Sequence, residues 1–298
     1  MKRLLCFLLV SIFALSVFSS CNAPEGTSEA WPEANPAHEF AYELMSEDTA
    51  VLIRSYIGTS KRVVIPAEIE GKPVIAINPG LAFQDPWLAV EELYIPSSVQ
   101  YIGIDAFTAV NWLRCVYFEE RDEQIMIATS AFFECEGLEK MVLPQHVVLQ
   151  KGSFDGCSNL KEVFIPNTVV FQGWGIFEGC SSLEKVVFED GIISLDVDAL
   201  FYYLRKLKNI TIPASVSEIS DAVFCYCVGL ETVTFLGDAP ELLGDDGTSA
   251  QLKTNTTWAS QQEGVRVTIY YDPATKGWDT FAYDAEAYVL VPLPAAES

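Results

Sequence analysis

One phrase recurs along most of this chain and constrains its fold more than any other feature. Its clearest copy, residues 153–166, reads Ser-Phe-Asp-Gly-Cys-Ser-Asn-Leu-Lys-Glu-Val-Phe-Ile-Pro. Val163 and Ile165 keep the period-2 alternation of a strand, and the proline ends that strand because it donates no ladder hydrogen bond. Phe154 and Cys157 lie three residues apart, which predicts one inward-facing turn of 3₁₀ or α-helix. One unit has nothing to pack against, so its copies must stack on each other.

The copies return at a nearly constant interval. The last residue of the phrase recurs at spacings of 30, 23, 25, 22, 23, 24 and 23 residues, at Pro66, Pro96, Glu119, Pro144, Pro166, Glu189, Pro213 and Leu236. The turn aromatic follows the same interval, at Phe83, Phe107, Phe132, Phe154, Phe177, Phe201 and Phe224. This period falls within the range of about 20–29 residues that is typical of leucine-rich repeats. The sequence therefore predicts one elongated solenoid rather than two ordinary domains.

The repeated pattern Ala-Phe-x-x-Cys-x-x-Leu-x-x-Val-x-Ile-Pro resembles the BspA-like leucine-rich repeat family of bacterial cell-surface proteins. The resemblance covers roughly residues 40–285. It implies a mostly β solenoid with one parallel sheet, short 3₁₀ or helical turns, and a cap at each end. It also implies adhesion to host matrix proteins or to other cells.

The N-terminus is typical of a targeting segment. Lys2 and Arg3 precede an apolar run over residues 4–18, which is short for a membrane-spanning helix. The following Phe-Ser-Ser-Cys resembles a lipobox, which implies that Cys21 carries lipid and becomes the new N-terminus. An ordinary secreted protein, cut near the same place, is the alternative.

The chain divides into five segments on composition and periodicity. Residues 22–38 are rich in proline, alanine and glutamate without an apolar period, which is typical of a disordered tether. After Phe235 the repeat fails, and Val267 with Ile269 form the expected inward pair of a closing strand. The expected organisation is a signal peptide (1–20), a tether (21–38), an N-terminal cap (39–74), leucine-rich repeats (75–236), and a C-terminal excursion and cap (237–298).

The charge balance excludes some partners. The formal net charge is −23, and removal of the leader takes away two basic residues. Such a surface repels nucleic acid and anionic lipid headgroups. We expect no nucleic-acid partner, and contact with the membrane only through the lipid on Cys21.

A cysteine column runs through the repeats, but valine and leucine occupy the same position. Its members are Val110, Cys135, Cys157, Cys180, Leu204 and Cys227. A position that accepts leucine and cysteine is one for a small buried hydrophobe, so we expect free thiols, although stacked rungs would be close enough for a bridge. The chain has two histidines, His38 and His146, and neither lies near a Cys-x-x-Cys, so a zinc site is not expected.

The residue after the repeated leucine is charged in every copy, and its sign alternates. The members are Lys61, Glu91, Arg114, Glu139, Lys161, Glu184, Lys208 and Glu231. In stacked strands each charge lies between opposite charges, whereas a slipped register would place like charges together. We interpret this column as register control.

The outward column of the strands is the candidate partner surface. It reads Val64, Tyr94, Tyr117, Val142, Phe164, Val187, Thr211 and Thr234, with Trp87 and Trp112 in nearby turns. Exposed apolar patches often mark interfaces, and tyrosine and tryptophan lead among interface hot spots. We therefore take Tyr94, Tyr117, Phe164 and Trp112 as partner-binding residues. Alternatively, such residues simply suit the surface of a sheet.

Nothing in the sequence indicates catalysis or a cofactor. A hydrolytic triad needs a histidine base beside a nucleophile, and neither histidine has that setting. Acidic residues in two turns could hold Ca²⁺ or simply be solvated; they are Asp190, Asp196, Asp198, Asp245 and Asp246. We expect a surface-anchored, non-catalytic binding module for a host matrix or cell-surface protein; the alternative is a lipoprotein that captures glycans through exposed aromatics.

Overall fold

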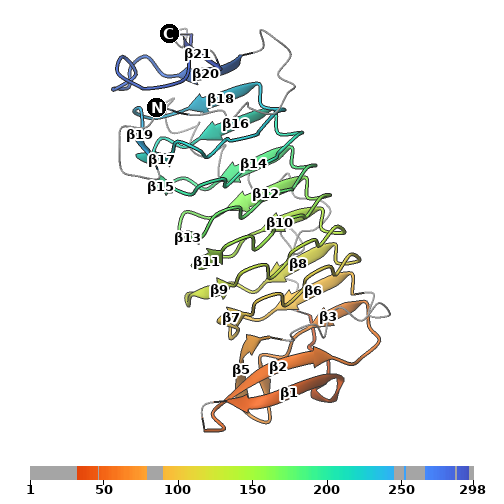
Figure 1. The fold of residues 1–298 in the computed structure, drawn as a ribbon. Helices are drawn as coiled ribbons and strands as arrows, with labels where there is room; N and C mark the ends of the chain where they lie inside the picture. Colours follow the sequence, from red (N-terminus) through yellow and green to blue (C-terminus); the bar gives the residue numbers. More distant parts are fainter. Residues whose placement is uncertain are drawn as a thin grey trace.

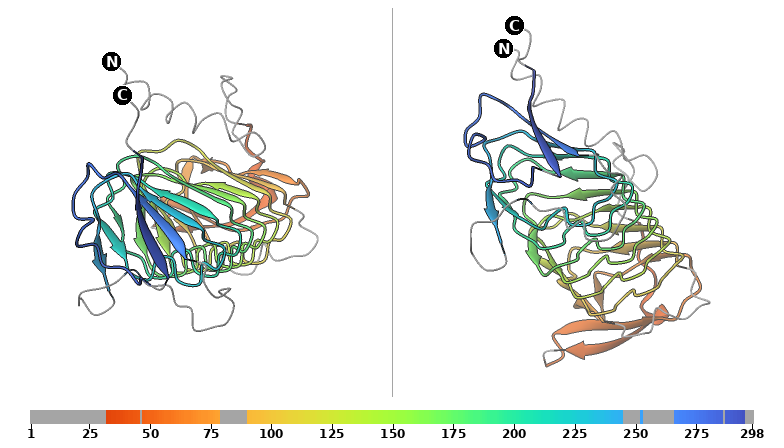
Figure 2. Two further views of the ribbon diagram at one scale, coloured as in Figure 1. Left: turned by 90° about the horizontal axis from the view of Figure 1, so that it is seen from above. Right: turned by 45° about the horizontal axis from the view of Figure 1, so that its top comes forward.

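The chain forms an elongated solenoid in a computed structural model (Figure 1). The structure describes residues 32–45, 47–78, 90–244, 252, 266–285 and 287–294. Cys21, Phe83, Trp87, Asp245 and Asp246 lie outside these residues. The rungs stack in chain order from β1 at one end to β21 at the other, as Figure 2 also shows from two further sides. This stacking confirms the leucine-rich repeat solenoid that the period predicts.

Each rung contributes strands to two faces. The strands that carry the repeated Val-x-Ile form the front face: β3 (Arg62–Val64), β6 (Glu92–Ile95), β8 (Cys115–Phe118), β10 (Lys140–Val142), β12 (Glu162–Ile165), β14 (Lys185–Phe188), β16 (Asn209–Ile212), β18 (Thr232–Phe235), β20 (Val267–Tyr271) and β21 (Tyr288–Pro292). The back face holds β5 (Lys72–Ile77), β7 (Tyr101–Ile102), β9 (Ile125–Ile127), β11 (Val147–Gln150), β13 (Val170–Gln172), β15 (Ser194–Leu195), β17 (Glu218–Ser220) and β19 (Glu241–Leu243).

The expectation of a single parallel sheet is therefore wrong, because the repeats form parallel strands on two faces. The segment after each strand-ending turn is also apolar enough to pair with its equivalent on the next rung. Leu149 of β11, for example, is buried between Ile127 of β9 and Phe171 of β13. Both faces are parallel along the repeats, and the core lies between them.

The register of the front face is the one that the outward column predicts. Tyr94 pairs with Tyr117, Phe164 lies between Val142 and Val187, and Thr211 pairs with Thr234. The alternating charge column forms rung-to-rung ion pairs at three places: Lys61–Glu91 at 2.6 Å, Glu139–Lys161 at 3.0 Å and Lys208–Glu231 at 2.9 Å. These pairs are exposed and each stabilises by only about 0.2–1 kcal/mol, so their effect is on register more than on stability.

A ladder of phenylalanine rings runs along one side of the core. Neighbouring rings are stacked, with centroids 5.0–6.4 Å apart and planes within 15° of parallel. Its members are Phe107, Phe132, Phe154, Phe177, Phe201 and Phe224, all of them fully buried. Stacked rings add about 0.5–1.5 kcal/mol per pair to the burial of their area. We call this feature the phenylalanine ladder.

The turns that carry the ladder are not helical, contrary to expectation. Ser130 and Glu134 flank Phe132 with φ of 56° and 54°, and Gly152 and Gly156 flank Phe154 with φ of 58° and 74°. These left-handed residues turn the backbone amides toward the next rung: Phe154 N donates to Ile176 O at 3.0 Å, and Gly156 N to Glu178 O at 2.8 Å. The one helix among the described residues is the 3₁₀ turn η1 (Ala37–Glu39).

The buried cysteines have a second role beside filling space. Cys135, Cys157, Cys180 and Cys227 carry free, buried thiols. Each Sγ donates to the carbonyl oxygen of the ladder phenylalanine one rung earlier, for example Cys157 to Phe132 at 3.2 Å and Cys135 to Phe107 at 3.0 Å. Burial raises the pKa of the Cys135, Cys180 and Cys227 thiols, which keeps these three protonated and able to donate.

The strands at both ends of the solenoid depart from the repeat. At the N-terminal end β1 (Phe40–Met45) pairs antiparallel with β2 (Ala50–Tyr56), and β4 (Glu68–Ile69) pairs antiparallel with β5. At the other end Trp278 is buried against Phe235, with ring centroids 5.2 Å apart. Val267 and Ile269 point inward from β20, as the alternation predicts.

We predict that Phe154→Ala lowers the free energy of unfolding by about 3–5 kcal/mol, because it leaves a cavity in the middle of the phenylalanine ladder. Urea unfolding followed by circular dichroism measures the change. Trp174→Ala, which removes a half-exposed ring from the same turn region, is the control and should cost less than about 1 kcal/mol. A loss below about 1 kcal/mol for Phe154→Ala would contradict the stacked core.

Candidate binding surfaces

The outer side of the front face brings the predicted aromatic residues together. The rings of Tyr94 and Tyr117 are stacked, with centroids 4.4 Å apart and planes at 21°. Val142 is exposed and Phe164 is half-buried on the next two rungs of the same column. Trp112, 59% exposed, lies in the turn before β8 and not on the sheet. Three of the four predicted residues therefore share one surface.

Tyr94 is not exposed as the alternation suggests. Its side chain is only 7% exposed, because the Arg62 guanidinium lies over its ring at 4.7 Å and the Tyr117 ring stacks against it. Arg62 Nη2 also donates to Tyr94 Oη at 2.8 Å. Burial, followed by the proximity of Tyr94, raises the pKa of Tyr117 to about 12. Tyr94 is therefore a buried residue that packs beneath the surface, whereas Tyr117 is partly exposed on it.

A second alternating charge column crosses this face and escaped the sequence analysis. Glu162 is 7% exposed and lies between two lysines of neighbouring strands, with Lys140 Nζ 3.4 Å from Oε2 and Lys185 Nζ in contact with Oε1. Arg62 and Glu92 form the same kind of pair at 3.6 Å. The signal was present two places after the repeated leucine, as Arg62 and Glu92 and again as Lys140, Glu162 and Lys185, but Cys115, Asn209 and Thr232 interrupt it.

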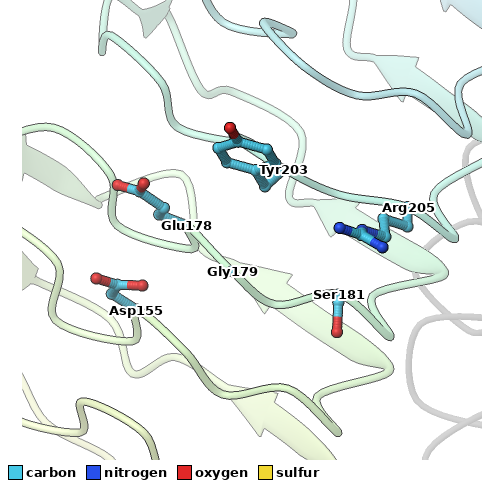
Figure 3. A pocket seen from close by; sticks show the side chains of 6 residues that line it. All are labelled: Asp155, Glu178, Gly179, Ser181, Tyr203 and Arg205. Carbon is cyan, nitrogen blue, oxygen red and sulfur yellow. The ribbon is translucent and has the colours of Figure 1, made fainter. Parts of the chain in front are cut away.

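A shallow pocket of about 410 Å³ lies at the turns beside the phenylalanine ladder (Figure 3). Three successive rungs line it, through Asp155, Glu178, Gly179, Ser181, Tyr203 and Arg205. None of these residues stood out in the sequence, because each falls at a position where the repeats differ from one another. We call this hollow the turn pocket.

Tyrosines build one wall of the turn pocket. Tyr203 is 43% exposed and stacks on Tyr226 of the next rung, with centroids 5.2 Å apart and planes at 22°. Tyr202 meets both rings edge-on, at 4.5 and 4.7 Å. Tyr203 and Tyr226 hold the left-handed position two residues after a ladder phenylalanine, with φ of 61° and 59°. That conformation directs their side chains away from the core.

The acidic end of the pocket is electrostatically strained. Burial and then repulsion from Glu178 and Glu134 raise the pKa of Asp155 to about 6, while Lys151 acts in the opposite direction. The turns place Glu134, Asp155 and Glu178 on consecutive rungs, and Lys151 offsets their mutual repulsion only in part. The ionised form of Asp155 therefore destabilises the folded chain near neutral pH.

The described residues offer no metal site and no membrane-spanning helix. Within the described ranges no three acidic, cysteine or histidine side chains converge to hold a metal ion. No helix in the same part of the chain is long and apolar enough to cross a bilayer. The pKa of Asp196 is raised by burial and then by Asp198 and Glu218, so these acidic side chains lie close together.

We predict that Asp155→Asn stabilises the protein near neutral pH. Between the ordinary pKa of 3.8 and the folded value of about 6, the folded chain keeps a proton that the unfolded chain has released, so stability falls as pH rises through this window. After discounting for solvent screening, the variant should gain about 1 kcal/mol at about pH 7.5 and nothing at about pH 3.5. Paired urea titrations of both chains measure the difference; an equal difference at both pH values would contradict the assignment.

The sequence matches the BspA type leucine rich repeat region in six copies, at residues 81–200 and 125–242. Among solved structures, the chain is similar to the leucine-rich repeat protein of T. pallidum, with 26% identity, a TM-score of 0.51, and coverage of 71% of this chain and 86% of that one. It is also similar in fold to a leucine rich cell surface protein of Faecalibacterium prausnitzii, at 22% identity, a TM-score of 0.58, and coverage of 82% and 71%. No functionally curated protein has a matching sequence.

The matched repeats span more than half of the chain, and the stacked rungs, the phenylalanine ladder and the cysteine column follow the same period. The protein belongs to the BspA-type leucine-rich repeat family.

Proposed function

We propose that this protein is a non-catalytic binding module on a bacterial cell surface, and that it recognises a protein of a host matrix or of another cell. A solved relative in fold is a leucine rich cell surface protein. Membership in a repeat family supports a binding role, because stacked repeats create extended, rigid surfaces. Fold alone does not assign a partner, so the proposal rests on the surface itself.

The observation that carries the proposal is the aromatic and apolar column on the outer side of the front face. Tyr117, Val142 and Phe164 stand on three successive rungs of the front face and are half-buried or exposed; β10 pairs with β12, whereas strand pairing is interrupted between β8 and β10. At the spacing of paired strands, about 4.8 Å, they cover roughly 10 Å along the solenoid. A few aromatic side chains of this kind can carry most of the energy of an interface. The ion pairs around Glu162 hold the surrounding sheet rigid, so little order is lost on binding.

We further propose that lipid on Cys21 holds the module at the membrane. The basic, apolar and Ser-Ser-Cys segments of the leader support this anchor. Residues 22–34 then act as a spacer between the lipid and the repeats, because their composition favours an extended chain. The expected tether is shorter than residues 21–38, since Asn35 exchanges two hydrogen bonds with Val64 and Ala37 packs against the core. The repeats would stand clear of the bilayer, where a partner can reach the front face.

Glycan capture is the second candidate. Trp112, Trp174 and Tyr203 present exposed or half-exposed rings at the turns, and flat rings of this kind can stack against a sugar. Quenching of tryptophan fluorescence by oligosaccharides would favour this function. No change across a panel of host and bacterial glycans would reject it.

We predict that replacing Tyr117, Val142 and Phe164 together with threonine lowers adhesion at least tenfold, a loss of about 1.4 kcal/mol. Threonine already occupies this column at positions 211 and 234, so the strands keep their propensity and the core is untouched. Binding of the mature chain to immobilised host matrix proteins measures the effect. The variant with Thr211 and Thr234 changed to serine is the control at the other end of the column.

Adhesion that survives the triple replacement would place the partner site elsewhere. A triple variant that unfolds would show that the column is structural, and the proposal would then be wrong. Tyr94 is left unchanged because its burial makes a stability effect certain to confuse the result.

We predict that Cys21→Ala releases the protein from the membrane fraction or blocks its processing, because the lipid is the proposed anchor. Fractionation of cells that express the full chain measures the change. Cys6→Ala, which alters the other cysteine of the leader, is the control and should leave the protein in the membrane fraction. If Cys21→Ala leaves the membrane fraction unchanged, lipid on this residue is not the anchor.

A further inference from the structure

The turn pocket differs from the rest of the surface in how its charges are arranged. At several positions of the front face, oppositely charged side chains pair across rungs, as at Glu139–Lys161 and Lys140–Glu162. Asp155, Glu178 and Arg205 form no ion pair and no side-chain hydrogen bond with any other described residue, although all three line one hollow. The turn pocket thus gathers charges of both signs that no described partner neutralises.

The unpaired charges are separated within the pocket. In Figure 3 the carboxylates of Asp155 and Glu178 lie at one end, and Arg205 and Ser181 lie at the other. The backbone of Gly179 crosses between them, and the Tyr203 ring stands alongside. A Cβ at Gly179 would come within 3.2 Å of Asp155 Oδ1, so the absence of a side chain there keeps this floor open. Gly179 also has φ of 70°, which other residues rarely adopt.

We propose that the turn pocket binds a segment of a partner protein through a lysine or arginine side chain. The cation lies between the carboxylates of Asp155 and Glu178 and against the ring of Tyr203. Arg205 and Ser181 donate to a carbonyl or carboxylate oxygen of the same segment. The occupant therefore matches the pocket in charge at both ends.

Charge complementarity favours this occupant over a neutral one. A basic side chain relieves the repulsion between Asp155 and its acidic neighbours, Glu178 and Glu134, and Lys151 does not neutralise them fully. A cation over the face of a tyrosine ring is attracted to it electrostatically, and more strongly when water is excluded. The formal charge of −23 also attracts basic partners and speeds their association.

This inference rests on the proposed function only in taking the partner to be a protein. The turn pocket is separate from the outer side of the front face, since it lies at the turns of the phenylalanine ladder. Its test uses a peptide probe and does not depend on adhesion. Failure of either proposal can therefore be recognised without the other.

The test is an NMR titration of the full mature chain at about pH 7.5 and physiological salt, where the Asp155 carboxyl is largely ionised. The probe is a blocked pentapeptide with one lysine and one aspartate, and the same peptide with norleucine in place of lysine is the control probe. We expect saturable shifts of the Gly179 and Ser181 amides with the lysine peptide and none with the norleucine peptide. We expect Glu178→Gln, and separately Asp155→Asn, to weaken binding at least fivefold.

The matched control variant is Glu184→Gln, on the same rung as Glu178. Glu184 is exposed, lies outside the pocket, and forms no ion pair with another described residue, so the substitution changes the net charge equally. Its affinity for the peptide should equal that of the unchanged chain. Equal weakening by Glu178→Gln and Glu184→Gln would overturn the proposal, because it would show attraction to the net charge alone. Shifts of Gly179 with neutral oligosaccharides but not with the lysine peptide would also overturn it, and would assign the pocket to glycans.

Discussion

The structure depends on the contact between one rung and the next. A single repeat is two short strands and two turns, with no core of its own, so every apolar side chain that it buries is buried by its neighbours. The phenylalanine ladder is the clearest case, since Phe154 is enclosed by Phe132 and Phe177 at 5.2 and 5.6 Å. Strand pairing and the turn amides add hydrogen bonds between successive rungs, along the axis of the solenoid. Stability is therefore distributed along the axis, and the surface is left to vary.

The columns could be predicted because the repeat has a nearly constant length, so equivalent residues of successive repeats lie at equivalent positions on successive rungs. Once Ile165 and Ile95 are aligned, Phe164 and Tyr94 must lie on the same face. The strand register in the structure agrees with this alignment. The turns could not be predicted in the same way. Their left-handed positions carry residues such as Glu134, Ala109 and Tyr203 more often than glycine, so no residue type marks them. The helical reading of the Phe-x-x-Cys spacing failed because inter-rung hydrogen bonds stabilise a different turn.

The candidate sites were predictable to different degrees. The outer column followed from alternation, but the burial of Tyr94 did not, because it depends on Arg62 from the preceding rung reaching over the ring. The turn pocket is assembled from single residues of three rungs at positions without a repeat signal. Several charges pair across rungs and favour the register, whereas Asp155, Glu178 and Arg205 form no ion pair with a described residue, so architecture and recognition use different side chains. Such a separation suits a family whose members share a scaffold and differ in their surfaces.

Native-state hydrogen exchange at the ladder amides tests the stacking of rungs most directly. The amides of Phe132, Phe154 and Phe177 donate to Ser153, Ile176 and Leu200 on the following rungs. If rung-to-rung contact holds the fold, these amides exchange only through large openings, with protection close to the global free energy of unfolding. Exchange of the Phe154 amide as fast as that of exposed turn amides would contradict the account.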